Sequence, residues 1–184
     1  MSRASTRASR RGTARDAVRG LPRRPRLEVA GGAELVMLVL ACHREDTAGL
    51  DLTSGATVRV RVAWPEDRAP DLDPFDVVEV QLAEEPEPDD LARPEAVTAK
   101  GLPRHLGNLR GRRVRRSLRR LTAPPEEHVL GFAGQAAPYW AFRGFRPSLA
   151  LLVPDKGPVL FRRLADRSVW VRFAWGRSDN WLPV

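Results

Sequence analysis

The sequence predicts an α+β protein in which two small antiparallel β regions, barrel-like or sheet-like, are joined by an arginine-rich amphipathic helix. Short runs in which apolar and polar residues alternate are typical of half-buried strands, and they occur in both halves of the 184-residue chain. Between them lies a stretch with apolar residues at helical spacing. The predicted divisions are a disordered basic arm over 1–26, an N-terminal β region over 27–100, the helix over 101–125 and an aromatic-rich β meander over 126–184. The two β regions are equally compatible with one domain over 27–184.

The first 26 residues are expected to form a disordered basic arm. Arg, Ser, Thr, Gly and Pro dominate this segment, so little apolar surface is available to offset the entropy lost on ordering. Nine arginines against the single acid Asp16 give it a net charge of +8. Such a tail is suited to an anionic partner.

Three strands are predicted in the N-terminal β region. LVMLVLAC at 35–42 is a continuous apolar run expected of a buried strand, whereas TVRVRVAW at 57–64 alternates strictly between valine and polar residues. FDVVEVQLA at 75–83 alternates in the same way, and the residues of 43–56 are rich in turn formers. Three strands joined by loops favour a small barrel or sheet.

Acidic residues gather in segment 66–95. Its twelve Asp and Glu residues against Arg68 and Arg93 give a net charge of −10, and its prolines favour a solvated loop. The protein therefore resembles a charged dipole, although its overall formal charge is +8. This acidic segment is the nearest counter-charge for the arginines that follow it.

Segment 104–120, RHLGNLRGRRVRRSLRR, carries eight arginines and no acid. A helix is predicted over 106–122, because apolar residues fall on one side of a helical projection and most arginines on the other. Gly107 and Gly111 weaken its first turns. The apolar side of the predicted helix consists of Leu106, Val114, Leu118 and Leu121.

The last third of the chain predicts a three-stranded antiparallel meander. SLALLV at 148–153, PVLFRR at 158–163 and SVWVRFAW at 168–175 have strand patterns, and they are separated by the turn sequences PDKG and LADR. Ten of the twelve aromatic residues lie between Phe132 and Trp181, interleaved with arginines. Most of these rings are expected in the core of a small β domain.

The charge pattern predicts a non-catalytic nucleic-acid-binding protein. Guanidinium groups on one face bridge successive phosphates and release counterions. RNA is favoured over DNA because aromatic residues beside arginines in a β-rich body suit unpaired bases. The predicted contact residues are Arg104, Arg110, Arg112, Arg113, Arg115, Arg116, Arg119, Arg120, Arg143, Arg146 and Trp140.

Two other classes of function remain open from the sequence. The arginines could instead meet an acidic protein surface, including self-association through segment 66–95. A third hypothesis is an enzyme whose polar groups converge near Trp140, Arg143, Asp179 and Asn180.

No catalytic residue, metal ligand or cofactor motif is predicted. Cys42 is the only cysteine, so no intrachain disulfide forms, and the histidine spacings match no metal-binding pattern. No glycine-rich phosphate loop occurs. The longest apolar run, 35–42, is about half of what a membrane span needs. A cytoplasmic protein without a membrane partner is expected, and no oligomeric state is predicted.

Overall fold

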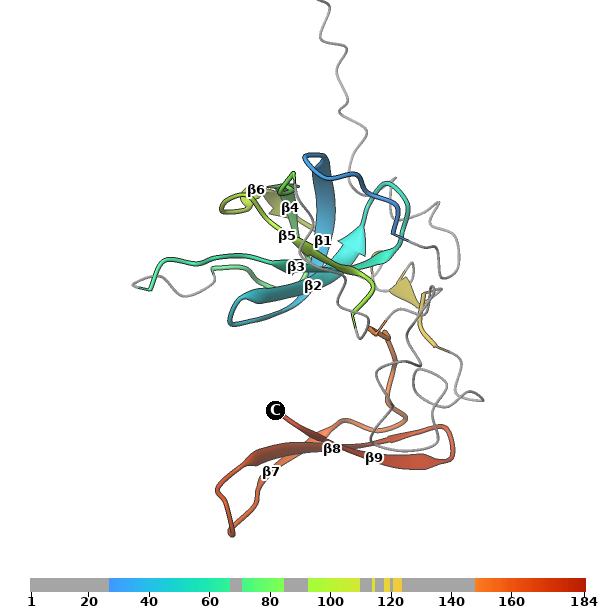
Figure 1. Cartoon of the computed structure of the whole chain (residues 1–184). Coiled ribbons are helices and arrows are strands. Elements are labelled where there is room, and N and C mark those ends of the chain that lie inside the picture. The colour runs from blue at the N-terminus through green and yellow to red at the C-terminus, as the bar shows by residue number, and fades with distance from the viewer. Residues whose placement is uncertain are drawn as a thin grey trace, which may run out of the picture.

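The computed structural model describes residues 27–66, 71–84, 93–109, 114, 118–119, 121–123 and 148–184. Their strands form a six-stranded sheet in the order β5-β3-β2-β1-β4-β6 and a three-stranded sheet in the order β7-β8-β9, coloured blue to yellow-green and orange to red in Figure 1. The strands of the first sheet are β1 Glu34–His43, β2 Asp46–Asp51, β3 Thr57–Arg61, β4 Asp76–Gln81, β5 Ala96–Thr98 and β6 Arg104–Asn108. Those of the second are β7 Val159–Arg162, β8 Val169–Trp175 and β9 Ser178–Pro183.

The six-stranded sheet closes into a barrel. β5 pairs in parallel with β3, whereas the other neighbouring strands pair antiparallel. Beyond β5 the chain turns back along β4, where Leu82 and Ala99 form a β-bridge and the Lys100 amide donates to the Gln81 carbonyl at 2.8 Å. β6 continues along the same edge of β4. The pairing order β1-β2-β3-β5-β4-β1 is that of a five-stranded Greek-key barrel.

The barrel interior is filled by one face of each strand. Alternation with a period of two sends the valines of β3 inward and its arginines outward, as the sequence pattern predicted. β1 supplies the matching apolar residues from the opposite wall. The interior cluster consists of Leu35, Met37, Val39, Val58, Val60, Val62, Val78, Val80, Leu82 and Ala99.

A second apolar cluster lies on the outside of the barrel. Leu38, Leu50 and Val77 come from β1, β2 and β4, so they face away from the interior. They are covered by Leu109, Val114 and Leu118, each about 6% exposed, with Leu121 and Leu151 packed beside them. The apolar residues after position 108 in the predicted helix are therefore buried against the barrel.

The predicted α+β class is wrong. The described residues contain no helix that joins the two sheets. Among them, helical backbone is assigned at two separate positions, Val114 and Leu118. Residues 104–108, expected to begin the helix, form β6 instead. The free edge of β4 offers unpaired backbone groups to this segment, and Gly107, with φ of 153° beside the bulge at Val77 and Val78, adopts a non-helical conformation. No helix in the described residues is long and apolar enough to cross a membrane.

The C-terminal sheet is antiparallel and three-stranded, and β7 and β8 lie within the predicted strands 158–163 and 168–175, but the remaining predicted strand is wrong. Segment 148–153 is not a strand: Ser148 bonds to Glu95, and the Leu151 carbonyl accepts a 2.8 Å bond from the Ala123 amide. The third strand is instead β9, which pairs with β8 across a turn at Gly176. The first sheet also departs from prediction, because it is mixed and extends to Asn108.

Candidate nucleic-acid interface and acidic pocket

Only two of the predicted contact residues belong to the described part of the chain. Arg104 lies on β6 and Arg119 is an exposed residue beside buried Leu118. The basic arm 1–26 also lies outside the described residues. The other nine predicted contact residues also lie outside the described part of the chain: Arg110, Arg112, Arg113, Arg115, Arg116, Arg120, Arg143, Arg146 and Trp140.

Arg104 is paired within the protein. Its Nε donates to Glu79 Oε1 at 2.7 Å across the β4–β6 pair, and its Nη2 contacts the same oxygen. The hydrogen bonds from Arg104 lower the pKa of Glu79, and the Glu79 carboxylate raises the pKa of Arg104. At this position an arginine of segment 104–120 meets a carboxylate of segment 66–95, so Arg104 is not a free phosphate contact.

Three other described residues of the arginine-rich segment are buried against the barrel. Leu109, Val114 and Leu118 are buried in the outer apolar cluster, and they lie among the arginines in sequence. Each buried leucine or valine side chain contributes about 1.5–3 kcal/mol relative to full exposure. These three apolar residues are therefore part of the folded surface of the barrel.

The C-terminal sheet has one aromatic face. Cross-strand neighbours share a face, so the pairs Phe161–Trp170 and Arg172–Trp181 place three rings and a guanidinium on the same side. Phe173 and Trp175 alternate to the other side, where they are 8% and 2% exposed. We call the set Phe161, Trp170, Trp181, Arg163 and Arg172 the ring face.

The groups of the ring face stack on one another. The Phe161 and Trp181 ring centroids lie 4.9 Å apart with their planes at 76°, an edge-to-face contact. The guanidinium carbon of Arg172 lies 5.2 Å from the Trp181 centroid, and that of Arg163 lies 5.6 Å from the Trp170 centroid. All three rings are half-buried.

Asp179 fixes the orientation of Arg172. Asp179 Oδ2 accepts bonds of 2.9 Å from Arg172 Nε and 2.7 Å from Arg172 Nη2, and Asp179 Oδ1 accepts a 3.1 Å bond from the same Nε. These bonds lower the pKa of Asp179 and raise that of Arg172. Asn180, also considered for an enzyme site, bonds to the Ser178 carbonyl at 3.3 Å. Asp179 and Asn180 therefore make hydrogen bonds within the sheet. The other two residues of the enzyme hypothesis, Trp140 and Arg143, lie outside the described residues.

Sequence reasoning missed the ring face because it depends on β9. The signal was present as Asp179, Trp181 and Pro183 at alternate positions after a short turn at Gly176. The strands predicted for this third of the chain end at Trp175 and do not include this segment. Only its pairing with β8 brings Trp181 beside Arg172.

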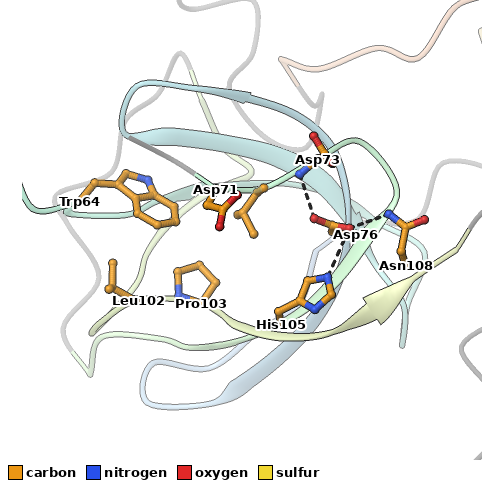
Figure 2. Close-up of a pocket in the computed structure, with 9 residues that line it drawn as sticks. Trp64, Asp71, Asp73, Asp76, Leu102, Pro103, His105 and Asn108 are labelled. Carbon is orange, nitrogen blue, oxygen red and sulfur yellow. Dashed lines mark hydrogen bonds and ion pairs between the residues drawn. The ribbon is translucent and has the colours of Figure 1, made fainter. Parts of the chain in front are cut away.

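A pocket that the sequence did not predict lies at one end of the barrel (Figure 2). It has a volume of about 550 Å³. Its residues come from the loop after β3, the start of β4, the β5–β6 connection and β6 itself. The lining residues are Trp64, Asp71, Leu72, Asp73, Asp76, Leu102, Pro103, His105 and Asn108.

Asp76 is the most buried carboxylate of the pocket. Burial raises its pKa, but hydrogen bonds from Asn108, from the Asp73 amide and from His105 outweigh burial and leave the pKa below its usual value. The Asn108 Nδ2 bond is 2.6 Å, the Asp73 amide bond 2.8 Å, and His105 Nε2 lies 3.3 Å away. The exposed side chains of Asp71 and Asp73 have no ion-pair partner among the described residues.

The described residues do not provide a metal centre. They contain no group of three His, Cys, Asp or Glu side chains arranged to hold an ion, even though four such side chains line the pocket. Cys42 Sγ lies 3.4 Å from Thr47 Oγ1 on the neighbouring strand.

No protein-family model, no curated protein and no solved structure matches this chain.

Proposed function

We propose that this protein binds single-stranded nucleic acid, RNA in preference to DNA. The observation that carries the proposal is the ring face, where Phe161, Trp170 and Trp181 share one side of an exposed sheet with two stacked guanidinium groups. Single-stranded RNA is recognised mainly by stacking its unpaired bases on aromatic rings and arginine planes.

The charge around the ring face fits a phosphate backbone. Residues 148–184 hold five arginines and one lysine against three aspartates. The guanidinium of Arg172, held by Asp179, offers its outer surface to a base while its inner surface covers Trp181. Segment 104–120 carries eight arginines and no acid, and this positive charge favours any polyanion.

The barrel gives weaker support. Its strand order is that of the OB-fold, a barrel that binds oligonucleotides across strands 2 and 3, and this is an analogy of fold alone. Here Arg59 on β3 is paired with Asp46 at 3.3 Å and lies 3.8 Å from Glu95. That surface is charge-balanced, so the proposal rests on the ring face.

Replacing Trp181 with alanine is expected to weaken binding of an oligouridine about 5- to 150-fold, because stacking contributes about 1–3 kcal/mol per base. Fluorescence anisotropy with a labelled oligouridine at fixed salt measures the effect. The matched control is Leu182→Ala, which alters the next residue of β9 on the opposite face. Circular dichroism establishes that both variants retain the sheet.

Two outcomes would overturn this proposal. Equal affinity of wild type and Trp181→Ala, or an equal loss in Leu182→Ala, would show that bases do not stack on the ring face. Tighter binding of oligothymidine than of oligouridine would contradict the preference for RNA.

A further inference from the structure

We propose that the pocket of Figure 2 binds the side chain of an arginine presented by a peptide. Its volume of about 550 Å³ lies within the range of small-ligand sites. The inference goes beyond nucleic-acid binding, because the residues involved belong to the barrel and not to the ring face.

The charge of the pocket selects a cation. The lining residues include three aspartates and, as the one basic side chain, a histidine. Asp76 is occupied by bonds from Asn108, the Asp73 amide and His105, which leaves the carboxylates of Asp71 and Asp73 without an ion-pair partner among the described residues, and the Asp71 carboxylate is the one proposed to pair with the ligand. In Figure 2 the Asp71 carboxylate lies between the apolar end of the pocket and the Asp76 end. Phosphate groups are repelled by this arrangement.

The apolar lining selects a cation with an apolar stem. Trp64, Leu102 and Pro103 gather at one end of the pocket in Figure 2, and Leu72 also lines it. They suit the methylene groups of a long side chain, whose charged head stays beside the carboxylate. A bare inorganic cation gains nothing from this surface.

An arginine fits better than a lysine. The planar guanidinium stacks on aromatic faces such as that of Trp64 and pairs with a carboxylate through two parallel hydrogen bonds. The ammonium group of lysine is more strongly hydrated and lacks this fork. The indole Nε1 of Trp64 is buried without a hydrogen-bond partner, so its resonance reports directly on changes in the pocket.

The test is a titration of the isotope-labelled full chain with N-acetyl-arginine methylamide, followed by nuclear magnetic resonance. We expect shifts at the Trp64 indole and at the amides of Leu102 and His105. Asp71→Asn removes the pairing charge with little change in shape and is expected to weaken binding about tenfold, the cost of one charge-assisted pair. The matched control, Asp155→Asn, removes one exposed carboxylate outside the pocket and should leave affinity unchanged.

Three results would overturn the proposal: shifts that avoid the pocket, equal binding by Asp71→Asn, or equal binding of N-acetyl-lysine methylamide. Oligouridine affinity measured on the same Asp71→Asn sample is expected to equal that of wild type. Failure of the pocket is thereby separated from failure of nucleic-acid binding.

Discussion

Gly49→Ala is expected to lower the free energy of unfolding by about 3 kcal/mol, at the upper end of the usual cost of overpacking a core. Gly49 lies on β2 opposite Val39, where β1 and β2 approach closely. An added Cβ would overlap the Leu38 carbonyl oxygen and the Met37 methyl group. Met37 is fully buried, and the Leu38 carbonyl belongs to the strand backbone, so neither moves without disturbing the barrel. Urea unfolding followed by circular dichroism measures the loss.

Gly101→Ala is the matched control. No atom lies within 4 Å of the position that its Cβ would occupy, and its backbone angle is not strained. We expect a change within about 0.5 kcal/mol, as for most surface substitutions. Equal unfolding midpoints for the two variants would show that β1 and β2 do not pack as described.

Glu95→Ala is expected to cost about 2–3 kcal/mol of stability, because it breaks a buried ionic and hydrogen-bonded contact. Glu95 is 3% exposed, accepts a 2.8 Å bond from the Ser148 amide and also bonds to the Ser148 hydroxyl. It lies 3.8 Å from the buried Nε of Arg59, which has no hydrogen-bond partner. Removing the carboxylate leaves that nitrogen without its nearest acid and releases the chain at Ser148. Thermal and urea unfolding measure the change.

Glu84→Ala provides the comparison for Glu95. Its side chain is 81% exposed and lies 4.0 Å from Lys100, so its loss should cost less than about 1 kcal/mol. The double variant Glu95→Ala/Ser148→Ala should lose less stability than the two single variants together, because they remove one shared contact. Strict additivity would argue against the Glu95–Ser148 link.

Strong alternation made three barrel strands predictable. β1, β3 and β4 coincide with the predicted runs because their apolar residues alternate or run continuously. The composition of DTAGLD predicts a turn, but these residues form β2. The residues that resemble a turn have structural roles in β2. Gly49 allows the close approach to β1, and Asp51 accepts hydrogen bonds from the Thr53 and Ser54 amides at the end of the strand.

The predicted start of the helix is wrong because local propensity competed with a sheet edge, and residues 104–108 form β6. Leu106 and Gly107 fit a weak helical start, but in the folded chain β4 pairs with His105 and Gly107 on either side of Leu106. Burial of Val114 and Leu118 is what the helical projection predicted. The same β4–β6 pairing brings Arg104 beside Glu79, and no pattern in the local sequence predicts this contact.

The two candidate sites also depend on contacts between distant residues. The pocket unites Trp64 with Asn108, which come from separate loops and strands. The ring face requires β9 to return beside β8. Composition pointed toward arginines and aromatic rings, but strand pairing decides which of them share a surface.

The central claim is that unpaired bases stack on the ring face. Ultraviolet crosslinking of the full chain to an oligouridine of about twelve nucleotides, within the range that small binding modules cover, tests it most directly. Mass spectrometry then identifies the crosslinked residues. We predict crosslinks at Phe161, Trp170 or Trp181, lost when excess unlabelled oligouridine competes. Crosslinks confined to residues outside β7, β8 and β9, or none at all, would contradict the account.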